Sequence, residues 1–352
     1  MNIVSTHAHY VYPDFYHDIS MTKLIGVSYP GWLTGYPGTV DAFESMFDTL
    51  AGNGCFYWLC RALGDLYNDG EIMTRDNWRA IEKRMQETYA ADPDFHNRII
   101  REKMGLKWVI LDEHRDPGCD HNLSWMRPSV RLDAWLLGQA RTTEETLDAY
   151  LDNMEALVKR RGRAVALKLA VAYARGLDFA PPDMEKARED FAAGQFSKTV
   201  QDTVAHRICD IAEAYDLPLQ FHTGHGCWEN TRAIHLLDMV KRHPKTRFVL
   251  LHCSVPWIDD ALALGYLPNV YVDLAFLPVL SMHMCARFVR EAVEMLIPEK
   301  IMWGCDTWTA EEAYGVLMAT REALRIGLDG MPQADIVERK ILHDNAVKLY
   351  KL

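Results

Sequence analysis

The runs "LPLQFHTG" (residues 217–224) and "TRFVLLHCS" (residues 246–254) are short, apolar and bounded by polar or glycine residues, and each carries a histidine near its end. Runs of this kind are typical of strands that are buried on both faces of a parallel sheet. Six further segments share the pattern: residues 1–9, 106–114, 130–138, 164–173, 269–276 and 299–306. The sequence therefore predicts eight buried strands along the chain.

Helical patterns lie between most of these strands, at residues 143–160, 202–216, 310–327 and 333–350. The first is expected to begin near Thr143, a possible cap, with Glu145 in its first turn. Alternating strands and helices predict the α/β class and a (β/α)₈ TIM barrel. A doubly wound open sheet is the alternative, but no GxGxxG motif follows the first strand and the chain has no Walker A sequence.

One region departs from this alternation. Residues 30–101 are rich in Trp and Tyr and contain helical patches such as residues 74–90. We expect a helical insertion between the first and second strands that caps the strand ends. The whole chain of 352 residues is then a single barrel domain, 1–352, because its length lies within the range of α/β barrels that fold as one unit.

Composition limits the classes of partner. The formal net charge of −11 disfavours binding to nucleic acid or to anionic membranes, which needs clustered Lys and Arg. There is no apolar run long enough to span a membrane, no leader pattern, and no CxxC pair among the eight cysteines. We therefore expect a cytoplasmic protein with reduced thiols that acts on a small molecule, without nucleic-acid or membrane partners, as a homo-oligomer.

Polar side chains recur at the strand ends, which is where α/β barrels place their chemistry. Taken singly, each has an ordinary explanation: a solvated pair at the N-terminus, a hydrogen-bonded core histidine, or a helix cap. Taken together they favour a shared divalent cation, because a buried polar group without a partner costs roughly 1–3 kcal/mol. Imidazole and carboxylate ligands suit Zn²⁺, and also Fe, Ni or Mn. The residues concerned are His7, His9, Lys168, His222, His252 and Asp306.

The order of these motifs resembles a known family. "THAH", "ALKLAVAYARGL", "LPLQFHTGHG", "FVLLHCSVPW", "NVYVDLAF", "MWGCD" and "ILHDNAVKLY" follow one another between residues 6 and 350. This pattern resembles the amidohydrolase superfamily, in its amidohydrolase-related (family 2) branch. It is most similar to the amidohydrolase domain of FluG- and nodulin-like proteins. The resemblance implies a single amidohydrolase-like TIM-barrel domain.

The resemblance also implies a ligand set. His7 and His9 match the metal-ligand pair of the first strand, and His222 matches the ligand of the fifth. Asp306 matches the carboxylate of the eighth strand, which touches the metal and handles a proton. One ion is commoner than two in this branch, so the expected cofactor is one divalent metal ion, with Zn²⁺ the first expectation.

Two further positions carry implied catalytic roles. His252 matches the histidine that orients or polarises water or substrate. Lys168 lies where binuclear relatives carry a carboxylated, metal-bridging lysine, and we expect it to stabilise charge or contact substrate instead. The sequence departs from the FluG-like pattern at His225 and Cys227, and at "DTW" (306–308), so the substrates of the family cannot be transferred.

These residues suggest a metal-dependent hydrolase that cleaves an amide, ester or lactone bond with an activated water. Tyr173 and Arg175 are candidates to bind a substrate carboxylate, since Arg offers a planar fork of donors. Pairing of Arg175 with Asp178 or with a backbone carbonyl is the structural alternative. A decarboxylase (lyase) or isomerase of an organic acid, using the same site, is the alternative function. A metal-binding barrel that serves only as a scaffold is a third hypothesis.

Overall fold

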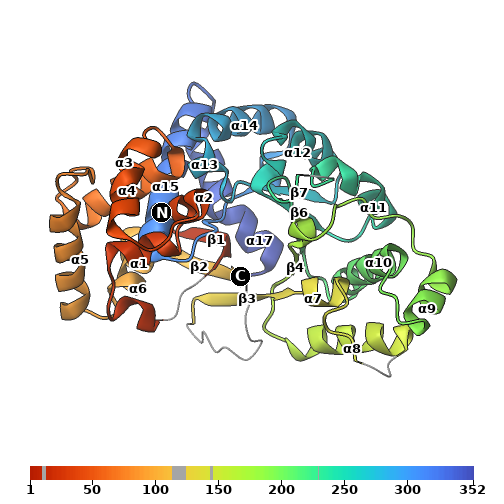
Figure 1. The fold of residues 1–352 in the computed structure, drawn as a ribbon. Coiled ribbons are helices and arrows are strands. Elements are labelled where there is room, and N and C mark those ends of the chain that lie inside the picture. Colours follow the sequence, from red (N-terminus) through yellow and green to blue (C-terminus); the bar gives the residue numbers. More distant parts are fainter. Residues whose placement is uncertain (10–12, 113–123, 143–145, 229) are drawn as a thin grey trace. The chain divides into compact units, whose positions relative to one another are not determined.

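The computed structural model describes residues 1–9, 13–112, 124–142, 146–228 and 230–352. Its strands form one eight-stranded sheet whose spatial order is the order of the chain, which confirms the predicted (β/α)₈ barrel fold (Figure 1). The strands are β1 (Ile3–Ala8), β2 (Leu106–Asp112), β3 (Met126–Arg131), β4 (Ala166–Leu169), β5 (Leu219–His222), β6 (Phe248–Leu251), β7 (Val270–Asp273) and β8 (Ile301–Met302).

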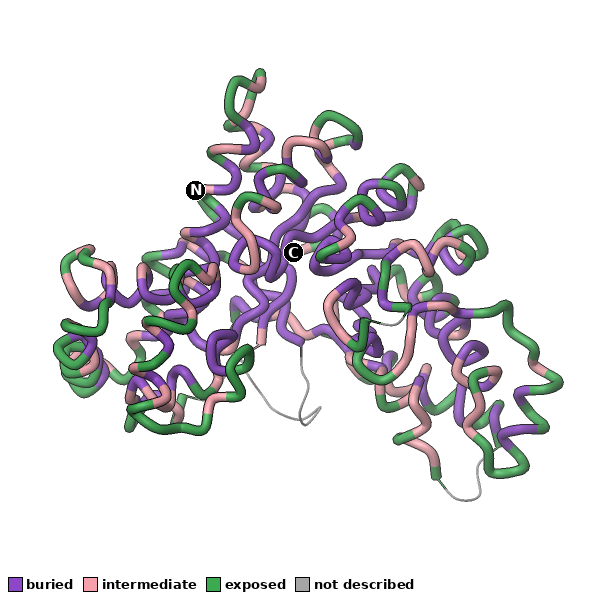
Figure 2. The backbone as a smooth tube through the Cα atoms, turned by 45° about the horizontal axis from the view of Figure 1, so that its top comes forward, coloured by how far each residue is buried: buried purple, intermediate pink, exposed green. Residues whose placement is uncertain are grey.

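The strand interiors explain this sheet. Every residue of β4, β5 and β6 is buried, as expected for strands that are covered on both faces. The pairing is parallel from β3 to β8. Leu219 lies opposite Leu167 on one side and Phe248 on the other, so apolar residues adjoin across the strands. Buried backbone is concentrated in the strands, and exposed backbone on the outer helices (Figure 2).

The segment after β8 runs beside β1 and brings the last strand to the first. The Thr6 N–H donates to the Trp303 carbonyl at 3.1 Å, and the Asp306 N–H donates to the His7 carbonyl at 2.9 Å. Gly304 permits this approach, because a Cβ at this position would lie 2.8 Å from the His7 backbone nitrogen. These contacts bring the segment after β8 alongside β1, and the eight strands form a nearly closed barrel.

Two sequence-based boundaries need correction. The third strand was predicted at residues 130–138, but β3 occupies Met126–Arg131 and a turn of helix, α7 (Asp133–Leu136), follows it. Pro128 obscures the strand pattern in the sequence, because proline has no N–H to donate within a sheet. Its carbonyl still accepts the Val165 N–H at 3.0 Å, so Pro128 can belong to the strand.

The helix predicted from residue 143 begins later. Helix α8 (Leu147–Arg160) is capped by Thr146, whose side chain accepts the Ala149 N–H at 3.2 Å. Thr143 and Glu145 lie outside the described residues. The other predicted helices correspond to α10 (Lys198–Ala214), α15 (Ala310–Gly327), α16 (Ala334–Arg339) and α17 (Asn345–Tyr350). The chain also forms α9 (Met184–Ala192), α11 (Leu237–Arg242), α12 (Ile258–Gly265), α13 (Leu277–Leu280) and α14 (Met282–Met295).

Contacts divide the chain into two compact units. The first unit comprises residues 1–109, 275–290 and 303–339. Between β1 and β2 it holds α1 (Met21–Gly26), α2 (Tyr29–Thr34), α3 (Val40–Thr49), α4 (Gly54–Tyr67), α5 (Trp78–Ala91) and α6 (Phe95–Arg98). Helices α1, α3, α4 and α5 share a hydrophobic core that includes Phe43, Trp78 and Met85. Helix α4 packs against α15 within this unit (Figure 1).

The second unit comprises residues 110–274, 291–302 and 340–352, and it holds β3–β8 with most of the connecting helices. The closing helix α17 is fixed here, because the Asn345 side-chain amide donates to the carbonyls of Pro298 and Ile301. The Tyr350 hydroxyl accepts a hydrogen bond from Gln220 of β5 at 2.9 Å. The C-terminal helix therefore supports the strands that carry the histidines of this unit.

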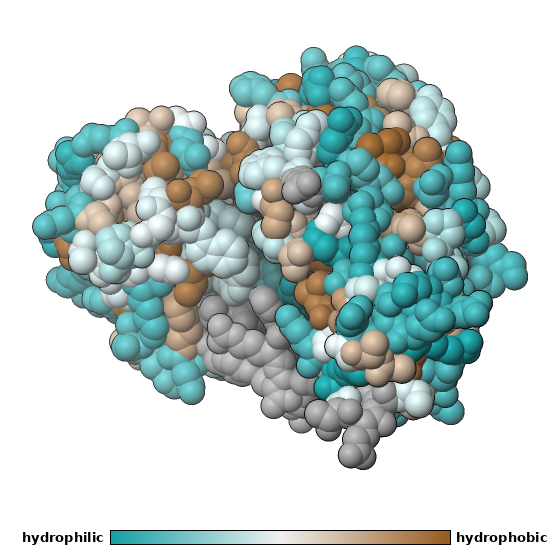
Figure 3. Space-filling view, turned by 45° about the vertical axis from the view of Figure 1, so that its right-hand side comes forward, coloured by the Kyte–Doolittle hydropathy of each residue, from teal (hydrophilic) through white to brown (hydrophobic). Residues whose placement is uncertain are grey.

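The surface agrees with the charge of the chain. Hydrophilic residues predominate on the face drawn in Figure 3, and hydrophobic ones occur there in separate groups. Among the described residues, no helix combines the length and the apolar character that crossing a membrane requires. The seven cysteines of the described residues are free thiols, and six of them are buried.

Candidate metal centre

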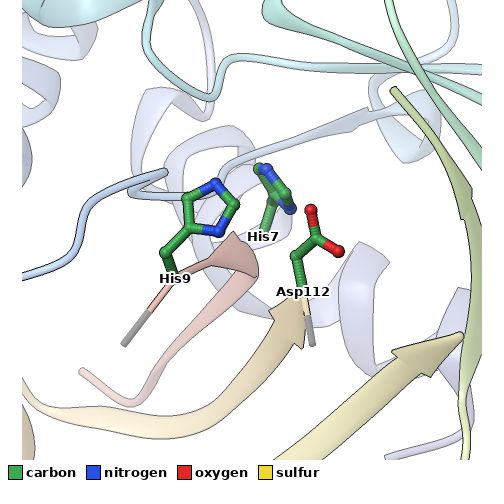
Figure 4. A group of neighbouring side chains, drawn as sticks. All are labelled: His7, His9 and Asp112. Atoms are coloured by element: carbon green, nitrogen blue, oxygen red, sulfur yellow. The ribbon is translucent and has the colours of Figure 1, made fainter. Parts of the chain in front are cut away.

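Three of the predicted ligands meet in the first unit. The Nε2 atoms of His7 and His9 lie 3.0 and 3.3 Å from the same oxygen, Oδ1 of Asp306. The side chains are 3%, 10% and 8% exposed, respectively. His7 and His9 are two residues apart in an extended segment, so both rings project to one side at the end of β1 (Figure 4).

The backbone of Asp306 is held in an uncommon conformation. Its φ of 53° lies in the left-handed region, which is unfavourable for most residues other than glycine. The Asp306 N–H donates to the His7 carbonyl, and the His9 N–H donates to the Thr307 carbonyl at 3.0 Å. Strain of this kind clusters at functional sites, where surrounding contacts hold it in place. Here these contacts keep the carboxylate beside both imidazoles.

This donor set fits a divalent cation. Two imidazole nitrogens and a carboxylate oxygen are ligands that Zn²⁺ and related ions accept. Without a cation, a buried carboxylate oxygen so close to two Nε2 atoms needs at least one of them to carry a proton. A bound cation would replace such protons and satisfy all three groups. The expectation that His7, His9 and Asp306 act together is therefore supported by their geometry.

His222 and His252 meet in the second unit. Nδ1 of His222 and Nε2 of His252 lie 2.9 Å apart, and Nε2 of His222 contacts the carbonyl of His225. A carbonyl only accepts, so Nε2 of His222 donates in this contact, and a neutral His222 ring would then accept from His252 at Nδ1. If His222 binds a metal ion through Nε2, this atom must first lose its hydrogen bond to the His225 carbonyl.

The turn after β6 is also strained. His252, Cys253 and Ser254 have successive φ values of 67°, 47° and 59°. The Ser254 N–H donates to the Thr223 hydroxyl at 3.0 Å, and the Ser254 hydroxyl accepts the Ala233 N–H at 2.8 Å. These bonds hold three left-handed residues in sequence, which places the imidazole of His252 against His222.

Lys168 lies in the second unit at the level of two polar neighbours. It is 1% exposed, and it pairs in register with Arg131 of β3 and Gln220 of β5. Burial of an ammonium group is costly unless neighbouring groups compensate its charge. A buried lysine near the end of a barrel strand is consistent with the predicted charge-stabilising role, which stays a prediction.

The two predicted carboxylate-binding residues differ. Tyr173 is 54% exposed, and its ring lies 4.7 Å from that of His222. The guanidinium of Arg175 donates to Asp202 at 2.9 Å, to Gln201 at 3.2 Å, and to the carbonyls of Gly176 and Asp178. These contacts match the structural alternative and leave the substrate-binding role of Arg175 without geometric support.

Sequence reasoning missed a charged group at the ends of β2 and β3. Asp112 ends β2 (Figure 4), and its Oδ2 lies 3.2 Å from Arg131, which also donates to Asp133 at 2.6 Å. The signal was available for Asp112, because it closes the apolar run "WVIL" as His222 closes its own strand. Arg131 was hidden, because the misplaced third strand put it inside the strand.

Trp308 and Glu312 lie near the ligands, and the sequence analysis did not predict that they would support the ligands. Trp308 stacks on His9 with ring centroids 4.3 Å apart and planes at 11°. Glu312 is buried, and its Oε1 accepts the Tyr29 N–H at 2.7 Å. Burial raises the pKa of Glu312 to about 8, and the charge of Asp306 adds to this rise. Tyr29 lies 283 residues before Glu312, so no local sequence pattern links the two.

The structure is thus an α/β barrel in which strand ends carry histidines and an aspartate, as the resemblance to the amidohydrolases implies. A family model described as amidohydrolase matches residues 152–352, which is more than half of the chain, and the chain belongs to this family. The match includes His222, His252 and Asp306, whereas His7 and His9 precede it.

Known proteins agree with this assignment. The chain is 27% identical over 244 residues to Protein fluG of Emericella nidulans. The matched region covers 58% of this chain and 28% of that protein. The chain thus spans well under half the length of this curated relative. The match to the amidohydrolase family supports an enzyme.

Solved structures share the fold. A protein of Lactobacillus casei described as a metal-dependent hydrolase matches with a TM-score of 0.75 and 20% identity, over 99% of this chain and 95% of that one. The glucuronate isomerase of Caulobacter crescentus matches with a TM-score of 0.75 and 13% identity, over 100% of this chain and 91% of that one. Both likenesses concern the fold alone.

Proposed function

We propose that this protein is a metal-dependent hydrolase that cleaves an amide, ester or lactone bond of a small substrate bearing a carboxylate. The convergence of His7 and His9 on one buried oxygen of Asp306 carries this proposal. Membership of the amidohydrolase family supports it. Zn²⁺ is the ion we propose, since imidazole and carboxylate ligands suit it.

The ligand residues define what an ion would do. His7, His9 and Asp306 would hold it, and His222 is proposed as a further ligand from the family resemblance. A divalent ion at such a site lowers the pKa of water and polarises a carbonyl group. Asp306 is the proposed proton acceptor, because a carboxylate beside the ion could take a proton from water and return it to the leaving group.

The residues of the second unit supply the remaining proposed roles. His252 lies against His222, and an imidazole in this position can stabilise the negative charge that develops on a carbonyl oxygen by donating a hydrogen bond. Lys168 is proposed to stabilise the same charge or to contact the substrate. Tyr173 is proposed to bind the substrate, and its exposed ring beside His222 supports this.

We also propose that the helical segment 30–101 borders the substrate entrance. Trp32 of α2 is 55% exposed, and its ring lies 4.5 Å from that of Trp308, which stacks on the ligand His9. The insertion thus reaches the neighbourhood of the metal ligands within the first unit. Its aromatic side chains would then take part in substrate choice.

Oxygen labelling tests the reaction type. Metal-loaded protein is incubated in ¹⁸O-water with lactones, N-acyl amino acids, aromatic carboxylates and uronates, and the products are analysed by mass spectrometry. Hydrolysis predicts one solvent oxygen in the newly formed carboxylate. The control is the His7→Ala, His9→Ala double variant, which should form no product. Release of CO₂, or isomerised product without added water, would contradict hydrolysis and favour the lyase or isomerase alternative.

A further inference from the structure

Tyr29 connects the inserted helices to the loop that carries Asp306. It is the first residue of α2 and is 6% exposed. Its hydroxyl donates a hydrogen bond to the backbone carbonyl of Asp306. Its own N–H donates to Oε1 of Glu312 at 2.7 Å. Tyr29 is therefore fixed at its backbone by α15 and fixes the Asp306 backbone with its side chain.

The bond from Tyr29 acts where the backbone is strained. Asp306 has a φ of 53°, and its N–H is already held by the His7 carbonyl. The Tyr29 hydroxyl holds the other peptide group of the same residue. Contacts on both sides of such a left-handed residue stabilise its backbone conformation. The direction of the Asp306 carboxylate thus depends on Tyr29.

The ring of Tyr29 supports a second ligand. It packs against Phe276 at 4.1 Å between centroids and meets the Trp308 ring edge-on at 5.9 Å. One face of Trp308 stacks on His9, and Trp32, one turn beyond Tyr29 in α2, also packs on Trp308. The plane of the His9 ring is thereby set by aromatic side chains that α2 supports.

We propose that Tyr29 is a positioning residue for the metal centre, acting on Asp306 through its hydroxyl and on His9 through Trp308. This inference rests on the proposed metal site. Residues that orient metal ligands without touching the ion commonly contribute tenfold or more to metal affinity. The inserted segment would then serve the metal centre as well as the substrate.

Cobalt titration tests the proposal without a substrate. Co²⁺ is added to metal-free protein, and the visible absorption gives both the affinity and the coordination spectrum. Tyr29→Phe removes only the hydroxyl and should weaken Co²⁺ binding about tenfold and shift the absorption bands. Tyr36→Phe is the matched control, because the Tyr36 hydroxyl also donates to a backbone carbonyl, that of Thr39 at 2.8 Å, but in an exposed position. It should leave affinity and spectrum unchanged.

A second pair of variants tests the aromatic support. Trp308→Ala should weaken Co²⁺ binding and alter the spectrum, whereas Trp308→Phe, which keeps a ring over His9, should restore part of the affinity. If the wild type binds Co²⁺ and Tyr29→Phe binds it with the same affinity and spectrum, the positioning role of Tyr29 is overturned. The proposed metal site would be unaffected by that result. A wild-type protein that binds no Co²⁺ would overturn the metal site, and this proposal with it.

Discussion

The residue that combines most functions is Asp306. Its carboxylate oxygen faces two imidazoles, its N–H binds the His7 carbonyl, and its carbonyl accepts the Tyr29 hydroxyl. Every polar group of its backbone is therefore used to aim one side chain. A helix cap, which was the structural alternative for Asp306, does not require these backbone contacts. Thr309 caps α15 instead, because its side chain accepts the Glu312 N–H.

Asp306→Asn separates a ligand from a proton acceptor. The amide keeps the shape and one coordinating oxygen but loses the negative charge and the basicity. Proton transfer by Asp306 predicts that turnover falls by roughly 10²–10⁴-fold even at full metal occupancy. Turnover measured against metal content, once a substrate is known, checks this. If excess metal restores the activity of Asp306→Asn, Asp306 is a metal ligand and not the proton acceptor.

Glu312 makes a prediction about pH. Burial raises its pKa from 4.5 to about 8, so between these values the folded protein holds a proton that the unfolded chain releases. The free energy of unfolding must then fall as the pH rises through this window. Glu312→Gln in metal-free protein should flatten this slope by up to about 1.4 kcal/mol per pH unit. Urea unfolding at pH 5, 6, 7 and 8 measures it.

The control for this prediction lies on the same helix. Glu322 is bound by Arg325, and this hydrogen bond lowers its pKa. It is ionised in both states above pH 5, so Glu322→Gln should leave the slope unchanged. Parallel stability curves for the wild type and Glu312→Gln would show that Glu312 is ionised in the folded protein.

At the level of elements, the strand ends were more predictable than the strand limits. Apolar runs that close in His or Asp identified His7, His9, His222, His252 and Asp306 from sequence. The third strand was misplaced because Pro128 interrupts its pattern and "DAWLL" imitates a strand. Tyr29 and Glu312 could not be predicted, because their roles arise from a contact between segments almost 300 residues apart.

The contact between α4 and α15 gives a prediction for the inserted helices. A Cβ at Gly315 of α15 would lie 2.7 Å from the Trp58 carbonyl oxygen of α4. Gly315→Ala should therefore destabilise the protein by about 1–3 kcal/mol, although Ala favours helices over Gly. Gly26→Ala in α1 is the control, because nothing lies within 4 Å of its Cβ position. Chemical unfolding compares the two, and equal stabilities would contradict close packing of α4 on α15.

At the level of the whole molecule, each compact unit contains some of the candidate site residues at its strand ends. The first carries His7, His9 and Asp306, and the second carries His222 and His252. The (β/α)₈ fold was predictable because the strand pattern repeats along the chain. The division of the candidate residues between two units was not, because contacts made by residues 275–290 and 303–339 with the N-terminal segment decide it.

Metal content tests the central claim most directly. Elemental analysis of the purified protein should find about one divalent ion per chain in the wild type and less than about a tenth of that in the folded His7→Ala, His9→Ala double variant, because both imidazole ligands are lost. His17→Ala, which removes an imidazole whose side chain is 63% exposed, should retain the ion. Full metal occupancy in the double variant would contradict the account, because His7 and His9 would then be structural residues and not metal ligands.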